Sequence, residues 1–304
     1  AQTDTASNYP NRAIRVVVPY PAGGTSDILV RLIGQKLTER WGQQIVVEAR
    51  PGAAGLIGTE VVARAQPDGY TLSGADMGSV MISWLAHPKP PFDYLRDLTP
   101  VMVMAYSPHV LCVHPSLPVK GVKELVALAK QRPGQLNFAA SLAGAPLMAG
   151  IDLAHRAGIK WTYITGRGGM QTIMDVVSGQ ADFGVNGMFA VFPHWRSGRL
   201  RILAVAAAER QGGALASVPT WHEQGIKAVS SNWRSVVGPA GLRAERIAYW
   251  DSVFAKLVRE DDWKKDITAH HFENTWLHST DTRKLMEVQF AELSTTLRTL
   301  GLAK

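Results

Sequence analysis

The residues best suited to binding chemistry form a glycine-containing turn near the N-terminus, Pro19-Tyr20-Pro21-Ala22-Gly23-Gly24. The β-branched run at 14–18 before it predicts a strand buried on both faces. Thr25, Ser26 and Asp27 supply capping side chains, and an apolar stripe at helical spacing follows. Such a turn leaves unpaired backbone N–H groups at the positive end of a helix dipole, which suits a carboxylate or a phosphate. A plain strand-to-helix turn that binds nothing is equally consistent with this stretch.

Motifs that carry out catalysis are absent from the sequence. The chain has no H-E-x-x-H, no G-x-S-x-G and no G-x-x-x-x-G-K-[ST], and the glycines at 52, 55 and 58 are not spaced as G-x-G-x-x-G. The adjacent His270 and His271 have no further ligand at metal-binding spacing. Carboxylates that could in principle form an acid–base pair are Asp27, Asp76, Asp175 and Asp182. Because their spacing predicts no pairing, we expect a binding protein and no enzyme, cofactor or metal.

Length and composition indicate a chain of about two domains with a mild attraction for anions. The 304 residues are 46% hydrophobic and 19% charged, which is material for about two domains. No apolar run is long enough to span a membrane. The net charge of +7 comes from 32 Lys and Arg against 25 Asp and Glu, and the basic residues are scattered. Scattered basic charge favours small anions over nucleic acid as partners.

The N-terminus and the cysteine content bear on the compartment. The chain begins with Ala1, and residues 1–10 form a polar, unpatterned leader. This pattern fits a mature exported chain whose secretory signal has been removed, although a shortened chain would look the same. The single cysteine, Cys112, lies in an apolar run and is expected in a core, so it neither proves nor excludes export.

The first part of the chain alternates strands and helices. Strands are expected at 14–18, 44–48 and 70–73 with helices between them, which predicts a parallel sheet. Asp76-Met77-Gly78-Ser79 follow the third strand, at the sheet edge where α/β proteins bind ligands. Residues 84–98 form a proline-rich excursion. Two apolar strands, 101–105 and 110–113, are then expected on either side of Ser107-Pro108, where the chain would cross between domains.

A second α/β unit repeats the same order of strand, small-residue turn and helix. Expected strands are at 137–140, 161–164, 182–186 and 200–206. Helices are expected at 122–130, from the turn at 141–146 to about 157, and at 170–177. A strand at 229–237 would return to the first domain, followed by helices at 243–259 and from 282 onward, the latter capped near Ser279 or Thr280. The last helix carries a single apolar stripe, Met286, Phe290, Leu293, Leu297 and Leu300.

Long motifs in order along nearly the whole chain resemble one family. The turn IRVVVPYPAGGTSD at 14–27 resembles the first signature of the Bug-type receptors, the periplasmic substrate-binding proteins of tripartite tricarboxylate transporters. The run VVEARPGAAGLIG at 46–58 resembles the second. Further similar motifs are AQPDGYTL at 65–72, DLTPV at 97–101, LPVK at 117–120, GQAD at 179–182, GRLR at 198–201 and VPT at 218–220.

The resemblance implies an α/β, two-lobed, type II Venus-flytrap fold with two crossing strands. Lobe 1 would comprise residues 1–105 and 230–304, and lobe 2 residues 106–229. In this family the first glycine turn holds a ligand carboxylate, mainly through backbone groups and partly through ordered waters. Carried over by position, lobe 1 would contribute Tyr20, Pro21, Ala22, Gly23, Gly24, Thr25, Asp76, Met77, Gly78 and Ser79. Lobe 2 would contribute Ser141, Ala143, Gly144, Ala145, Arg167, Gly168, Gly169 and Asn186.

Departures from the family pattern bear on the ligand. The second turn, SLAGAP at 141–146, lacks the hydroxyls that usually follow its glycines, and Gly166-Arg167-Gly168 replaces the usual Tyr-Lys-Gly. Asn186 stands where many members have Asp, which argues against an amino-acid ligand. These changes predict a roomier, more apolar pocket. We expect an aromatic mono- or dicarboxylate such as terephthalate, with Arg167 and Arg234 as candidates for a second acidic group; solvated surface charges are the equal alternative for both.

The expected role is a monomeric receptor in the periplasm of a Gram-negative cell. It would capture a small organic carboxylate, close around it and deliver it to the membrane components of a tripartite tricarboxylate-type transporter. A receptor for small aliphatic di- or tricarboxylates is one alternative. A sensor that presents the same closed shape to a signalling receptor is another. An enzyme on an α/β scaffold would require a reactive residue that the sequence does not reveal.

Overall fold

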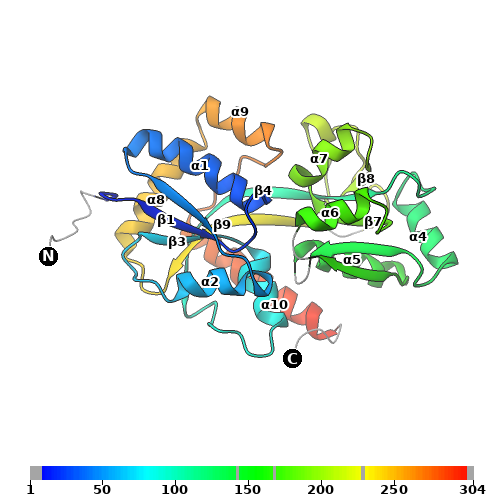
Figure 1. Ribbon diagram of the computed structural model, residues 1–304, viewed down its shortest axis with the longest axis horizontal. Helices are drawn as coiled ribbons and strands as arrows, with labels where there is room; N and C mark the ends of the chain where they lie inside the picture. The colour runs from blue at the N-terminus through cyan, green and yellow to red at the C-terminus, as the bar shows by residue number, and fades with distance from the viewer. Residues whose placement is uncertain (1–8, 142–143, 167–168, 227–229, 300–304) are drawn as a thin grey trace. The chain divides into compact units, whose positions relative to one another are not determined.

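The computed structural model describes residues 9–141, 144–166, 169–226 and 230–299. The chain divides into two compact units. Unit 1 comprises Ala1–Tyr106, Trp233–Ala269 and Asn274–Lys304, and unit 2 comprises Ser107–Asn232 and His270–Glu273. The division falls inside two strands, β4 (Leu98–Val113) and β9 (Ser231–Pro239), which run from one unit into the other (Figure 1).

Unit 1 is built on a sheet in the order β2-β1-β3-β9. Strands β1 (Ile14–Val18), β2 (Ile45–Ala49) and β3 (Thr71–Asp76) are parallel, and β9 runs antiparallel to β3. Helix α1 (Thr25–Trp41) follows β1 and α2 (Leu56–Ala63) follows β2. Because the chain steps from β1 outward to β2 and then back past β1 to β3, right-handed crossovers put these helices on opposite faces, above and below the sheet in Figure 1.

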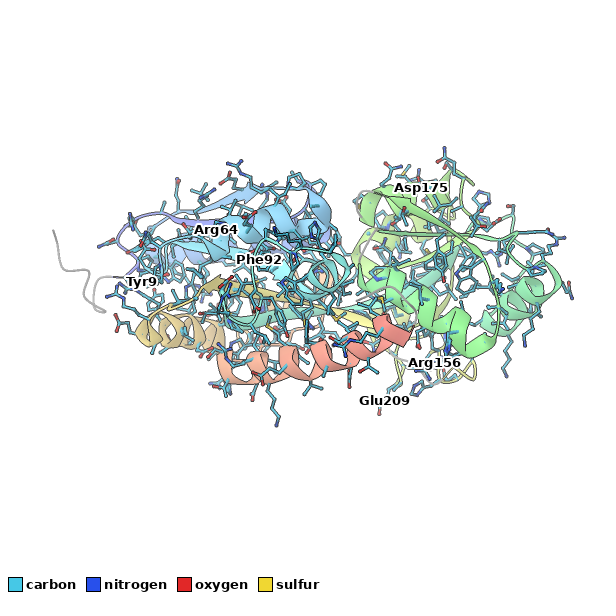
Figure 2. The ribbon with its side chains drawn as sticks, turned by 90° about the horizontal axis from the view of Figure 1, so that it is seen from below. Tyr9, Arg64, Phe92, Arg156, Asp175 and Glu209 are labelled. Carbon is cyan, nitrogen blue, oxygen red and sulfur yellow. The ribbon has the colours of Figure 1, made fainter. Side chains whose placement is uncertain are left out.

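The C-terminal helices complete unit 1. They are α8 (Ala244–Leu257), α9 (Asp261–Ala269) and α10 (Ser279–Thr299). Tyr9, labelled in Figure 2, joins the N-terminal segment to α8: its hydroxyl donates to the carbonyl of Gly69 at 2.7 Å and accepts from Nε1 of Trp250 at 3.1 Å. The stripe expected on α10 is buried at Met286 and Leu297, whereas Leu300 lies outside the described residues.

Unit 2 contains a mixed sheet in the order β8-β4-β7-β5-β6. Strands β5 (Asn137–Ser141), β6 (Thr162–Gly166) and β7 (Phe183–Gly187) are parallel, whereas β4 runs antiparallel to both β7 and β8 (Arg201–Val205). The helices that pack on it are α4 (Val122–Gln131), α5 (Ala145–Ala157), α6 (Gly169–Val177) and α7 (Met188–Arg196).

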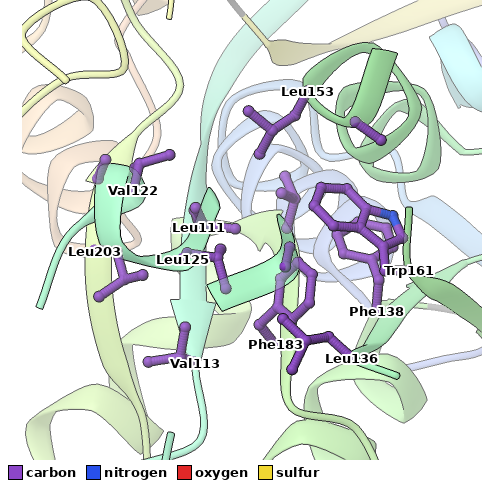
Figure 3. Close-up of a cluster of buried hydrophobic side chains, with 14 of the residues drawn as sticks. Leu111, Val113, Val122, Leu125, Leu136, Phe138, Leu153, Trp161, Phe183 and Leu203 are labelled. Atoms are coloured by element: carbon purple, nitrogen blue, oxygen red, sulfur yellow. The ribbon is translucent and has the colours of Figure 1, made fainter. Parts of the chain in front are cut away.

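The core of unit 2 is rich in aromatic rings (Figure 3). Phe138 on β5 stacks on Trp161 with ring centroids 5.6 Å apart, and Phe183 on β7 meets Trp161 edge-on at 5.0 Å. Helix α5 approaches this cluster so closely that a Cβ at Gly150 would lie 2.3 Å from Cζ of Phe138. The packing therefore requires a glycine in mid-helix, despite its cost of about 1 kcal/mol relative to alanine.

The crossing region differs from the sequence-based expectation. We expected two strands broken at Ser107-Pro108, but β4 continues from Leu98 to Val113. A proline fixes φ near the value of extended backbone and removes only one donor, so it can lie within a strand. Residues 270–273, which we had placed in lobe 1, belong to unit 2, where His271 contacts the ring of Phe192 at a centroid distance of 3.8 Å.

Some of the helical segments were not predicted from the sequence. Residues 78–86, where the sequence predicted no helix and a proline-rich excursion from residue 84, form a π-helical turn (Gly78–Ile82) and α3 (Ser83–Ala86). Helix α7 was missed because Met188–Arg196 is rich in aromatics and contains Pro193, all weak helix formers. Helix α9 was missed because few apolar residues mark its buried face, among them Trp263 and Ile267.

Candidate functional site

The glycine turn of unit 1 lies at the carboxyl end of β1, where the parallel strands β2 and β3 also end. Pro21, Ala22 and Gly23 are exposed, and Gly24 is the N-cap residue of α1. The first intrahelical hydrogen bond runs from the N–H of Ile28 to the carbonyl of Gly24 at 3.0 Å. By helix geometry the N–H groups of residues 25–27 therefore have no acceptor within α1. They form a set of donors at the positive end of the helix dipole.

Asp27 shapes the turn, but it does so differently from the capping role that we expected. Among the described residues, no side chain forms a capping hydrogen bond to the start of α1. The Asp27 carboxylate instead accepts from the N–H of Gly23 at 3.0 Å, which fixes the left-handed turn at that glycine, φ 79°. Arg31 donates to the same carboxylate at 2.9 and 3.0 Å. Burial acts to raise the pKa of Asp27, but the hydrogen bonds from Arg31 and Gly23 outweigh it and lower the pKa overall.

Asp76, at the end of β3, joins several of the predicted site residues. Its Oδ1 accepts from the Tyr20 hydroxyl at 2.6 Å and from the N–H of Ser79 at 2.9 Å. Its Oδ2 accepts from Nη1 of Arg234 at 2.5 Å, directly across the β3–β9 register. The pKa of Tyr20 is raised well above its usual value, first by burial and then by the neighbouring Asp76 charge. Met77 and Gly78, which lie between Asp76 and Ser79 in the sequence, are both buried.

The loop before α2 supports this site, a role that was not predicted from the sequence. A Cβ on Gly55 would lie 2.7 Å from Cβ of Ser79, and one on Gly58 would lie 2.8 Å from Cα of Pro19. The Ser83 hydroxyl interacts with the carbonyls of Ala54 at 2.6 Å and Gly78 at 2.8 Å. The glycines of this loop thus let it pack directly against both predicted binding turns. Their positions were visible in the sequence, but their partners were not.

Unit 2 offers a comparable edge of its own. Strands β5, β6 and β7 are parallel, and each leads into a helix, so the N-termini of α5, α6 and α7 follow their carboxyl ends. Gly144 is the N-cap of α5, with Pro146 in its first turn, and Gly169 begins α6. Ser141 is the last residue of β5. The predicted residues Ala143, Arg167 and Gly168 lie outside the described residues.

Asn186 holds the start of α6 in place. Its Nδ2 donates to the carbonyl of Gly169 and to the hydroxyl of Thr172, each at 3.0 Å, and its Oδ1 accepts from the N–H of Gly187 at 2.9 Å. The side chain is buried. Both donors of Asn186 therefore have partners within unit 2, and Gly169, another predicted residue, is one of them.

The other chemical candidates have structural partners. Asp175, labelled in Figure 2, accepts from Nε2 of Gln171 at 2.8 Å, and Asp182 accepts from the N–H of Asn137 at 2.7 Å. Burial raises the pKa of the Cys112 thiol to about 12, so it stays protonated. Burial and the neighbouring His270 lower the pKa of His271. Among the described residues no group of three or more His, Cys, Asp or Glu could hold a metal ion.

Residues 29–302 match the model of a protein family described as the tripartite tricarboxylate transporter family receptor. The chain belongs to this family. Its members are periplasmic substrate-binding receptors of transporters and not enzymes. The resemblance inferred from the sequence motifs is thus confirmed. Within the part of the chain that the structure describes, no helix is long and apolar enough to cross a membrane.

Individual relatives agree with this assignment. The chain is 34% identical to the protein BugT of Bordetella pertussis over 240 residues, which is 78% of this chain and 73% of BugT. Among solved structures, R. palustris Rpa4515 with adipate is 29% identical with a TM-score of 0.92, over 97% of this chain and 99% of that one. The periplasmic binding protein BugD is 23% identical with a TM-score of 0.87, over 97% and 100% of the two chains. The α/β periplasmic-binding-protein fold is therefore confirmed.

Proposed function

We propose that this receptor binds a small organic carboxylate and delivers it to the membrane components of a tripartite tricarboxylate-type transporter, acting as a monomer in the periplasm. The observation that carries the proposal is the glycine turn before α1. Its donors at residues 25–27 have no acceptor within the helix, in a chain that belongs to a receptor family. Fixed N–H groups at a helix N-terminus favour an anion without placing a mobile positive charge in the site.

The surroundings of the turn support an anion as the ligand. The carboxylate of Asp27 is engaged by Gly23 and Arg31, and that of Asp76 by Arg234. Each of the two carboxylates is therefore paired with an arginine, and neither presents an unpaired negative charge to the N–H groups of residues 25–27. In unit 2, the starts of α5 and α6, with the neighbouring Arg167 in the sequence, are the proposed source of further donors.

For the ligand we propose an acid with a sizeable carbon frame. The sequence departures at 141–146 and 166–168 support an aromatic acid such as terephthalate, because hydroxyls and a tyrosine ring usual in the family are missing there. The similarity to a structure with adipate supports an aliphatic dicarboxylate of comparable length as the second candidate. Both candidates share two carboxylates separated by an apolar frame.

Isothermal titration calorimetry of the purified chain tests the proposal. The ligands are terephthalate, benzoate, adipate, citrate and malate, each compared with buffer of matched ionic strength. We expect at least one acid with a long frame to bind with a Kd in the micromolar range or below, about −8 kcal/mol or stronger. Tight binding of malate without any binding of the aromatic acids would overturn the aromatic assignment. Binding of none of the five would overturn the proposed function.

A further inference from the structure

The ion pair between Asp76 and Arg234 is unusually deep for charged residues. The Arg234 side chain is 8% exposed and that of Asp76 is 6% exposed, and they face each other across the β3–β9 register. Nη1 of Arg234 donates to Oδ2 of Asp76, while Nε of Arg234 has no hydrogen-bond partner among the described residues. Removing two charges from water is costly, so a buried ion pair is weak evidence of added stability. The alternative to a role of this ion pair in stability is a role in ligand binding.

The location of Asp76 suggests that role. Its Oδ1 holds the hydroxyl of Tyr20, the residue directly before the exposed part of the glycine turn, and the N–H of Ser79. The turn therefore depends on an oxygen acceptor at this position. A carboxylate supplies that acceptor, but it also brings a negative charge to the sheet edge that carries the N–H donors at residues 25–27, the groups that are to receive an anion. In a site of low dielectric constant such a charge repels the ligand strongly.

We propose that Arg234 is a specificity-determining residue that acts through Asp76. Its guanidinium cancels the charge of the Asp76 carboxylate, so that Asp76 can fix Tyr20 and Ser79 while the turn stays receptive to anions. This role rests on the proposed function. It differs from direct pairing of Arg234 with a ligand carboxylate, because the cation is engaged by Asp76 within unit 1. The two roles make opposite predictions when both charges are removed together.

The experiment compares carboxylate binding by the wild type, Arg234→Gln and the double variant Asp76→Asn/Arg234→Gln, using the same five acids in calorimetry. In Arg234→Gln the Asp76 carboxylate loses the cation that it pairs with across the β3–β9 register, and we expect carboxylate binding to weaken about tenfold or more. In the double variant an amide pair replaces the ion pair and retains an oxygen for Tyr20 and Ser79, and we expect affinity within about threefold of wild type. Arg243→Gln is the matched control, because it removes an exposed cation of the same unit and should leave affinity unchanged.

Thermal unfolding followed by circular dichroism checks that each variant is folded. If Arg234→Gln does not fold, the double variant still decides the question, since it removes the cation while keeping the site free of the Asp76 charge. A folded double variant that remains at least about tenfold weaker than wild type would overturn the proposal and indicate direct contact of Arg234 with the ligand. Equal affinity of Arg234→Gln and wild type would overturn it as well. Failure of the wild type to bind any acid would instead overturn the proposed function on which it rests.

Discussion

A proline at the first residue of α1 removes one proposed ligand donor with little other change. Thr25 is the first residue of the helix, a position where proline is well tolerated because its missing N–H has no intrahelical acceptor. The preceding Gly24 has φ −76° and ψ 168°, a conformation that a residue before proline readily adopts. Thr25→Pro should therefore fold normally while one N–H that faces the expected anion is lost.

The expected loss follows from the strength of one hydrogen bond to a charged group. Such a bond contributes roughly 1.5–3 kcal/mol. The affinity for a bound carboxylate should therefore fall by about ten- to 150-fold in calorimetry. The free energy of unfolding should stay within about 1 kcal/mol of wild type, because the proline also restricts the unfolded chain.

Two controls make this result specific. Thr25→Ala keeps the N–H and removes only the side chain, so its affinity should stay close to that of wild type. Ala244→Pro places a proline at the first residue of α8, where the preceding Arg243 also has an extended conformation, φ −62° and ψ 137°. It should not change ligand affinity. Equal affinity of Thr25→Pro and wild type for every acid that binds would refute the assignment of this donor.

Three further predictions concern the scaffold around the site and are measured by urea unfolding. Gly58→Ala should destabilise the protein by about 1–3 kcal/mol, because the new Cβ would lie 2.7 Å from the carbonyl oxygen of Arg50; Gly212→Ala, with no atom within 4 Å of its added Cβ, should change stability by less than about 0.5 kcal/mol. Leu153→Ala in the core of unit 2 should cost about 2–5 kcal/mol, and a smaller cost would contradict the packing described. The lowered pKa of Asp27 means that its stabilising contribution is full above its unfolded-state pKa, about 3.9, and is lost as pH falls through its lower folded-state pKa. Wild type should therefore lose more stability than Asp27→Asn between pH 6 and pH 3, and equal losses would show that the Asp27 hydrogen bonds contribute nothing.

Local pattern was enough to predict the elements that carry the first turn. The run of β-branched residues at Ile14–Val18, the glycines after it and the apolar stripe of α1 all act over short distances. The same holds for β5, β6 and β7. Helix α7 escaped prediction because tertiary packing of Phe189 and Phe192 outweighs the weak propensity of its sequence.

The pairing of residues that are distant in the chain could not be predicted from the sequence. Asp76 and Arg234 are 158 positions apart, and only the β3–β9 register brings them together. Arg234 therefore appeared either as a ligand contact or as a surface charge, whereas the structure shows it buried and paired. Asp27 was expected to cap α1, but its partner is the glycine before the helix, since the loop turns back over its side chain. In each case the sequence drew attention to the residue, but the fold decided its partner.

The most direct test of the central claim is a crystal structure of this receptor with the tightest-binding acid from the calorimetric panel. We expect a ligand carboxylate oxygen about 2.7–3.1 Å from the backbone nitrogen of at least one residue among Thr25, Ser26 and Asp27. Arg234 should remain paired with Asp76 in that structure. A ligand whose carboxylates make no contact with the start of α1 would contradict the account.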